Sequence, residues 1–206
     1  MLIPTRKILW LCYLLVFLPH SAMAAKDGPN PYLKGIKIIS YSLLVEKTVG
    51  GEECNIDQKN LETSILFVAN QSTKLKIVPF NRRLDRSIEL FDQSNVPSLS
   101  SADKEAAKKA AHDYNLMPTL SINIMPLQTQ VGCAAEVSAK LDAYIEENPR
   151  MIPTQVVVSG PMIEIWAAGY GLVYPQQTFS DQTINTVEQI MKQLVNDWNA
   201  SQYGIP

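Results

Sequence analysis

Histidine and cysteine are scarce in this chain. Its 206 residues include two histidines and three cysteines. His20 and Cys12 lie in the first 24 residues, which we expect to be removed during export, so His112, Cys54 and Cys133 remain. A closed zinc site takes four ligands, mostly cysteine and histidine. The mature sequence therefore predicts no metal site.

Motifs of cofactor and nucleophile chemistry are also absent. No stretch fits a glycine-rich dinucleotide or phosphate loop, the H-E-x-x-H zinc motif, the G-x-S-x-G nucleophile turn or an EF-hand loop. The sequence predicts no cofactor and favours a protein that is not an enzyme. A hydrolase that uses paired carboxylates stays open, because several acids could meet in space with His112 as a helper. These acids are Glu46, Glu52, Glu53, Glu146 and Glu147.

Basic residues are in deficit once the first 24 residues are set aside. The whole chain has 18 lysines and arginines against 20 acidic residues, and Arg6 and Lys7 are the charged residues of the first 24. This leaves 16 against 20, a formal charge of −4. Nucleic-acid backbones and anionic lipid surfaces attract basic proteins. The charge balance therefore predicts no nucleic-acid partner.

One apolar run suggests export. Ile8–Leu18 follows Arg6 and Lys7 and precedes Ala22-Met23-Ala24. A run shorter than the roughly 20 residues of a membrane span, with basic residues before it and small residues after it, is typical of a cleaved signal peptide. We expect residues 1–24 to be a signal peptide, with no membrane span after cleavage and a periplasmic or secreted location. An uncleaved anchor is the alternative.

Cys54 and Cys133 are the cysteines of the expected mature chain. An even pair in an exported protein indicates a disulfide. Closing a loop of about 80 residues restricts the unfolded chain and stabilises the fold by roughly 4–5 kcal/mol. A redox-active pair is the alternative, although the cysteines of such pairs usually lie close in sequence, as in Cys-x-x-Cys.

The centre of the expected fold is the segment Thr119–Glu147. Leu120, Ile122 and Ile124 alternate with polar residues, which is the period of a half-buried strand, and the alternation resumes after Gly132. The segment predicts an antiparallel hairpin with one solvated face. A helix is the alternative for the second half, since four apolar residues there also recur at helical spacing. They are Ala134, Val137, Leu141 and Ile145.

The remaining segments predict an α+β fold. We expect residues 25–34 to form a disordered leader and residues 35–203 to form a single domain. Apolar runs predict strands and capped amphipathic runs predict helices. The further strands are expected at Gly35–Glu46, Leu75–Val78 and Thr154–Tyr174, and the helices at 55–71, 100–115 and 181–203. The order β-α-β-α-β-β-β-α predicts a mixed, mostly antiparallel sheet of about five strands with helices packed on one face.

Phe80–Leu99 is the least regular stretch. We expect a solvated surface loop there, with a single helical turn around Arg86–Phe91. Arg82, Arg83 and Arg86 lie in this stretch, and the planar guanidinium group is suited to bidentate contacts with carboxylates. The three arginines are therefore candidate residues for binding an acidic partner.

An alanine-rich helix that leads into the strand Pro118-Thr119-Leu120 follows in the chain. In this feature, in the order of its elements and in its export signal, the chain resembles the small α/β domains of bacterial envelope proteins, such as the N-terminal domain of TolB and the FlgO and CsgG group. The resemblance covers most of the mature chain and implies a place in the cell envelope. It includes no residue-level motif, so it implies no catalytic or binding residue.

These observations favour an exported, non-catalytic accessory module that docks onto another protein of the cell envelope. An exposed sheet edge and the Arg82–Arg86 segment are the candidate docking surfaces. The alternatives are a secreted carboxylate-based hydrolase, a small-ligand carrier and a secreted inhibitor. A pocket that gathers two acids would favour the hydrolase, a hollow apolar cavity the carrier, and a rigid protruding Phe80–Leu99 segment the inhibitor.

Overall fold

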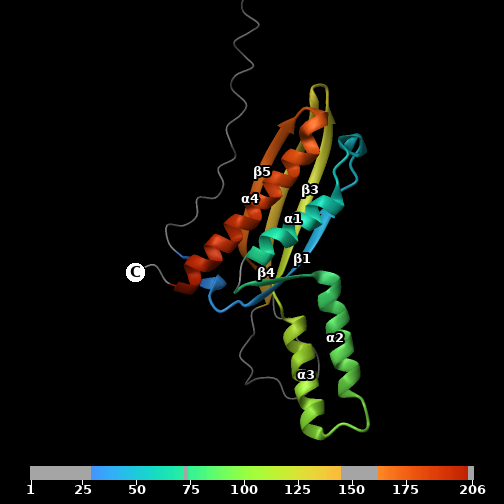
Figure 1. Ribbon diagram of the computed structural model, residues 1–206, viewed down its shortest axis with the longest axis vertical. Coiled ribbons are helices and arrows are strands. Elements are labelled where there is room, and N and C mark those ends of the chain that lie inside the picture. Colours follow the sequence, from blue (N-terminus) through green and yellow to red (C-terminus); the bar gives the residue numbers. More distant parts are fainter. Residues whose placement is uncertain (1–28, 72–73, 145–161, 204–206) are drawn as a thin grey trace, which may run out of the picture.

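A computed structural model describes residues 29–71, 74–144 and 162–203. Its centre is a five-stranded sheet in the order β2-β1-β3-β4-β5, accompanied by four α-helices in these ranges (Figure 1). The strands are β1 (Ile38–Val45), β2 (Lys76–Pro79), β3 (Thr119–Thr129), β4 (Gly132–Tyr144) and β5 (Met162–Tyr174). The helices are α1 (Gln58–Gln71), α2 (Phe80–Ser94), α3 (Ser101–Asn115) and α4 (Gln176–Tyr203). The expected α+β class with a mixed five-stranded sheet is confirmed.

Several sequence expectations lie outside the described residues. The expected signal peptide at 1–24 is among them, as are residues 25–28 of the expected leader. Residues 154–161 of the last expected strand are also outside, and β5 begins at Met162.

Parallel and antiparallel pairing divide the sheet. β1 pairs in parallel with β2 and β3, whereas β3, β4 and β5 form an antiparallel meander. Along β4, Leu141 pairs with Leu120 and Val137 with Ile124. The helical alternative for residues 133–144 is therefore wrong. Pairing on both sides, with β3 and β5, outweighs the helix propensity of the alanines in this strand.

One face of the sheet carries the core. Ile122 and Ile124 of β3 and Val137 of β4 are fully buried, in one apolar cluster with residues of α1 and α4. Figure 1 shows these two helices lying across the sheet. The alternate residues Ser121 and Lys140 face the opposite side and are exposed. The expected hairpin with one solvated face is confirmed, because successive strand residues point to opposite faces.

Two expected helices begin at the caps that the sequence indicates. The Asp57 carboxylate accepts a 3.0 Å hydrogen bond from the backbone N–H of Asn60 at the start of α1. The Ser100 hydroxyl accepts one of 3.2 Å from the N–H of Asp103 at the start of α3. Such oxygens satisfy N–H groups that lack a partner in the first helical turn. The last helix, α4, begins at Gln176, five residues before the expected start at Asp181.

The expectation of a loop over Phe80–Leu99 is wrong. Residues Phe80–Ser94 form the helix α2, which packs against α3 as a helical hairpin. Figure 1 shows this hairpin extending beyond the end of the sheet, whereas α1 and α4 lie across its face. We call the α2–α3 hairpin the arm.

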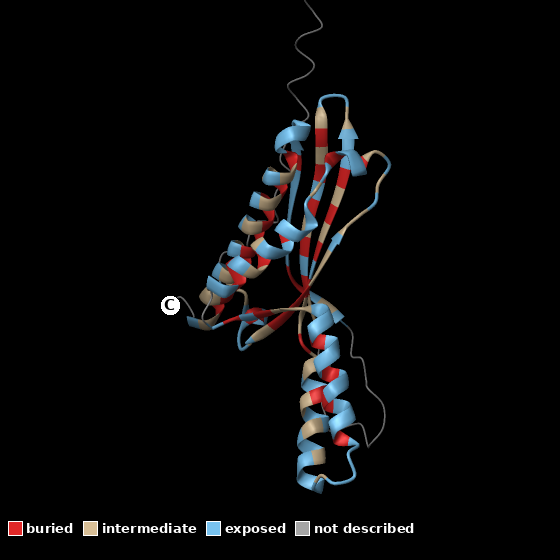
Figure 2. Cartoon of the chain, turned by 45° about the vertical axis from the view of Figure 1, so that its right-hand side comes forward, coloured by how far each residue is buried: buried red, intermediate tan, exposed pale blue. Residues whose placement is uncertain are grey.

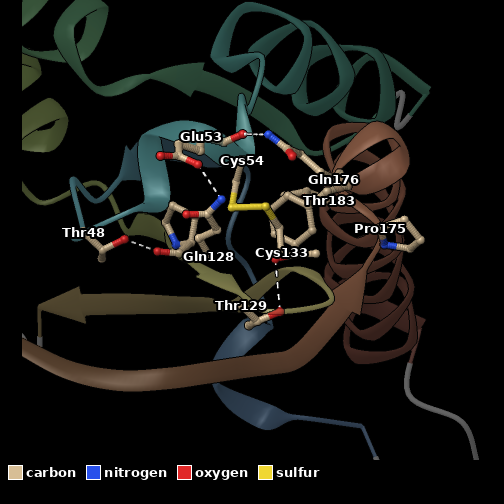
Figure 3. The surroundings of a disulfide bond; sticks show 12 residues. Thr48, Glu53, Cys54, Gln128, Thr129, Cys133, Pro175, Gln176 and Thr183 are labelled. Atoms are coloured by element: carbon tan, nitrogen blue, oxygen red, sulfur yellow. Dashed lines mark hydrogen bonds between the residues drawn. A yellow bond between two sulfur atoms is a disulfide. The ribbon is translucent and has the colours of Figure 1, made fainter.

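A disulfide joins Cys54 to Cys133, the two cysteines of the expected mature chain (Figure 3). Cys54 ends a short 3-10 helix (Gly51–Cys54), Cys133 lies at the start of β4, and both are buried. Beside the bond, the side chains of Gln128 and Gln176 donate hydrogen bonds to the carboxylate and the backbone carbonyl of Glu53. The disulfide therefore lies where the β3–β4 hairpin, the 3-10 helix and the start of α4 meet.

Candidate functional site

The inward face of α2 is small and polar. Its buried residues are Arg83, Ser87, Leu90 and Ser94, which recur at steps of three and four. This spacing places them on one side of the helix. Leu90 is the one large apolar side chain in this row, so the row supplies little hydrophobic burial to the arm.

The large apolar side chains of α2 instead lie on an exposed face. Phe80, Leu84, Ile88 and Phe91 are 41%, 47%, 53% and 57% exposed. At about 100° per residue they form one row, roughly a quarter turn around the helix from the buried row. We call these four residues the α2 stripe. Its exposed surface is on the order of 300–400 Å², which is the size at which apolar patches on monomers commonly serve as interaction sites.

The two helices of the arm meet through an interface with few large apolar side chains. The Ser87 hydroxyl donates a 3.3 Å hydrogen bond to the backbone carbonyl of Ala111 on α3. Leu90 and Ala111 are buried there but do not belong to the hydrophobic core beneath the sheet. Figure 2 shows a few buried residues between the helices and an exposed outer surface. The arm thus exposes more large apolar side chains than it buries.

Arg83 connects the arm to the sheet. Its Nη1 donates hydrogen bonds to the Ser40 hydroxyl (3.1 Å), the Met117 carbonyl (3.1 Å) and the Thr119 hydroxyl (2.6 Å). The Arg83 guanidinium also lies 5.2 Å from the centre of the Phe80 ring, a cation–π geometry. Burial lowers the pKa of Arg83 from its usual value. These contacts hold the first turn of α2 against the ends of β1 and β3.

The three candidate arginines do not form a common surface. Arg83 is only 8% exposed, and its guanidinium is bonded to groups of the sheet, so it does not lie on the outer surface of α2 with the other two. Arg86 is exposed and forms an ion pair with Glu89 (2.6 Å), and this hydrogen bond raises the pKa of Arg86. Arg82 is exposed on the same helix. The inward row at 83, 87, 90 and 94 was the available sequence signal, but its serines and arginine do not resemble a buried face.

The candidate catalytic groups have other surroundings. His112 is exposed, with its Nδ1 4.0 Å from the Asp113 carboxylate. Glu46 accepts a 2.7 Å hydrogen bond from the side-chain amide of Asn123, and Glu53 is bound by the glutamines beside the disulfide. Glu146 and Glu147 lie outside the described residues. Within the described ranges, no three or more His, Cys, Asp or Glu side chains come together as metal ligands would.

An open groove of about 480 Å³ lies between the end of α1 and the C-terminal half of α4. Val68 and Val195 line it together with Lys74, Lys192 and Tyr203. Lys74 lies over the Tyr203 ring, 4.7 Å from its centre. No carboxylate lines this groove, so it offers no paired acids for hydrolysis. It is also not the hollow apolar cavity expected of a carrier.

The two edges of the sheet differ in their protection. β2 is four residues long, with a lysine and a proline, features that discourage pairing with another strand. β5 has 13 residues. Its first part has a register irregularity opposite Leu141 and Asp142, and the Asn30 amide donates to the Ile165 carbonyl (2.7 Å). The later part of β5, Ala167–Tyr174, has no charged residue. Among the described strands it is therefore the edge that is less protected against pairing with another strand.

Comparisons with known proteins identify no family. No protein-family model matches the sequence, and neither does any curated protein. One similar solved structure is the hypothetical protein CT253 from Chlamydia trachomatis, at 8% identity and a TM-score of 0.40, covering 79% of this chain and 98% of that one. So remote a likeness supports no functional argument. In the described parts of the chain, no helix combines the length and the apolar character that crossing a membrane requires.

Proposed function

We propose that this chain is an exported, non-catalytic docking module that binds another protein of the cell envelope through the α2 stripe. The observation that supports the proposal is the inverted arrangement of α2, with serines and an arginine packed inward and Phe80, Leu84, Ile88 and Phe91 exposed. Single exposed apolar residues are ordinary on protein surfaces. Four of them on successive turns of one projecting helix form a continuous surface, and binding a partner would bury it.

The energetics of the arm agree with this proposal. Helical hairpins owe most of their stability to packed apolar faces, and the interior of this arm contains few large apolar side chains. Burying the stripe would contribute roughly 25 cal/mol per Å² of apolar surface. A partner would therefore stabilise the arm as well as bind it, in accord with linkage between binding and folding.

The proposed compartment rests on two features. Residues 1–24 have the pattern of a signal peptide, and a buried disulfide fits an oxidising compartment such as the periplasm or the extracellular space. Intact mass analysis of the mature protein tests this part of the proposal. We expect a chain that begins at Ala25 and contains no free thiol. A full-length chain with free thiols would contradict export.

Site-specific crosslinking in intact cells tests docking. A photo-crosslinking amino acid at Leu84 or Ile88 should yield one reproducible adduct with an envelope protein. The same amino acid at Ser121, on the open face of the sheet, is the matched exposed control and should not. Substituting Phe91→Ser in the chain that is labelled at Leu84 should remove the adduct, because the contact surface is lost. Equal adducts from Leu84 and Ser121, or none, would contradict the proposal.

A second candidate function rests on the same projecting arm. A secreted inhibitor also presents a protruding segment to its target, and the helical arm projects beyond the end of the sheet in this way (Figure 1). The identity of the crosslinked protein separates the two functions. A partner from the cell's own envelope supports docking, whereas an adduct that forms only with a protein outside the cell supports inhibition.

A further inference from the structure

The shape of the α2 stripe favours a helical partner. From Phe80 to Phe91 the stripe runs for about 16 Å along one helix, at 1.5 Å per residue. Its side chains recur at three- and four-residue steps, and such rows interlock with the corresponding rows of a second helix. A partner strand would need unpaired backbone groups, and the helical surface of α2 offers none. About three turns of a partner helix would match the length of the stripe.

Acidic side chains border the α2 stripe, whereas the two exposed arginines of α2 lie on the side of the helix opposite the stripe. Asp85 and Asp92 are exposed and follow Ile88 around the helix by roughly 40–60°. They therefore border the stripe on the side away from the buried row. Among the described residues neither aspartate has an ion-pair partner. Arg82 and Arg86 lie opposite the stripe, about 60° and 100° beyond Asp85 around the helix. Arg86 is paired there with Glu89.

The two aspartates beside the stripe favour a basic protein partner over a second copy of this chain or an anionic membrane. If two copies paired through their stripes with the helices antiparallel, two-fold symmetry would place the same border of both stripes on the same side of the interface. Asp85 would then face Asp85 of the second copy, and like charges in contact are unfavourable. An anionic membrane would also meet these aspartates. Lysines or arginines beside the apolar face of a partner helix would instead pair with them.

We propose that the α2 stripe binds an amphipathic helix of a protein partner, with basic residues of that helix placed against Asp85 and Asp92. This inference rests on the proposed docking function and names the chemistry of the partner. The apolar stripe supplies the affinity, and the two aspartates set which helices are accepted and in which orientation.

Two designed peptides of about 18 residues, long enough to form helices, test this inference. Both have the same leucine and alanine face, and one has lysines beside that face where the other has glutamates. Binding to the full mature chain is measured by fluorescence anisotropy at low salt. We expect the lysine peptide to bind about tenfold more tightly than the glutamate peptide. Leu84→Glu with Ile88→Glu should abolish the binding of the lysine peptide.

Charge reversal provides the matched control. Asp85→Lys with Asp92→Lys should invert the preference between the peptides. Glu62→Lys with Asp181→Lys, at exposed positions on α1 and α4, changes the net charge equally and should leave the preference unchanged. Equal binding of both peptides, or an equal effect of the two reversals, would overturn the inference.

The outcomes separate this inference from the docking function. If neither peptide binds while Leu84 still crosslinks to an envelope protein in cells, the helix chemistry is wrong and docking stands. Adducts between two copies of the chain would overturn both, and binding to anionic vesicles that needs the stripe would replace the protein partner with a lipid surface.

Discussion

Arg83 of α2 donates a 2.6 Å hydrogen bond to the hydroxyl of Thr119, the first residue of β3. The same nitrogen also reaches Ser40 of β1 and the carbonyl of Met117. One buried guanidinium therefore bridges the arm and the parallel half of the sheet. Its position fixes the direction in which the α2 stripe is presented.

Replacing Arg83 should loosen this connection. Arg83→Met keeps an unbranched apolar stem but removes the donor to Ser40, Thr119 and the Met117 carbonyl. Hydrogen bonds to charged groups contribute about 1.5–3 kcal/mol, so we expect the free energy of unfolding to fall by about 2–3 kcal/mol in urea titrations. Amide exchange in α2 should accelerate. Arg82→Met, at the exposed neighbour, is the control and should stay within about 0.5 kcal/mol. Equal effects at both sites would contradict the role of Arg83.

The two faces of the sheet should respond differently to the same kind of truncation. Ile124 is fully buried and Leu127 is 53% exposed, both on β3. Ile124→Ala creates a cavity and should lower the free energy of unfolding by about 2–5 kcal/mol. Leu127→Ala should change it by less than about 1 kcal/mol. Thermal unfolding of both variants measures the difference, and comparable losses would mean that the open face is covered.

The disulfide should account for a large part of the stability. The two cysteines are 79 residues apart, so their bond removes considerable freedom from the unfolded chain. The double substitution Cys54→Ala with Cys133→Ala should lower the free energy of unfolding by about 4 kcal/mol. The wild-type chain treated with a reductant in urea should unfold at a similarly lowered urea concentration. An unchanged midpoint in both experiments would show that the bond contributes little.

Substitutions in the α2 stripe should impair binding, whereas substitutions in the inward row of α2 should impair folding. Leu84→Ser removes an exposed side chain and should change the free energy of unfolding by less than about 1 kcal/mol. Leu90→Ser places a hydroxyl in the interface with α3, so α2 should lose about 2–3 kcal/mol of protection in amide exchange. Crosslinking from Ile88 should be lost in the first variant because its contact surface is reduced. Destabilisation by Leu84→Ser equal to that by Leu90→Ser would place the stripe inside the fold.

The sheet was largely predictable from the sequence because its burial is one-sided. In Thr119–Tyr144, alternating residues face the core and the solvent, so the period of two is visible along both strands. Helix α2 was not predictable in the same way. Its buried row contains an arginine and two serines, and its apolar row is exposed. Even a correct helix prediction would have turned Phe80, Leu84, Ile88 and Phe91 inward, because the usual rule places apolar side chains in the core.

The candidate site was missed for a related reason. Arginine is usually exposed, so Arg82, Arg83 and Arg86 were expected to act alike on one surface. Only Arg83 has neighbours in space that bury it, whereas Arg82 and Arg86 are exposed. Arg83 lies one helical turn from Phe80 and meets hydroxyls of β1 and β3, a contact between residues 36 and 43 positions apart that local patterns do not reveal.

The arm leaves and rejoins the sheet at the same end, on the two strands that flank β1. Pro79, the last residue of β2, pairs with Tyr41, and Thr119, the first residue of β3, pairs with Ser40. The two strands flank β1, so departure and return lie about 10 Å apart. Lengthening or shortening both helices by whole turns would therefore change the reach of the protein and leave its foundation as it is. The α2–α3 hairpin could therefore be replaced by a hairpin with a different binding surface while the five-stranded sheet is kept.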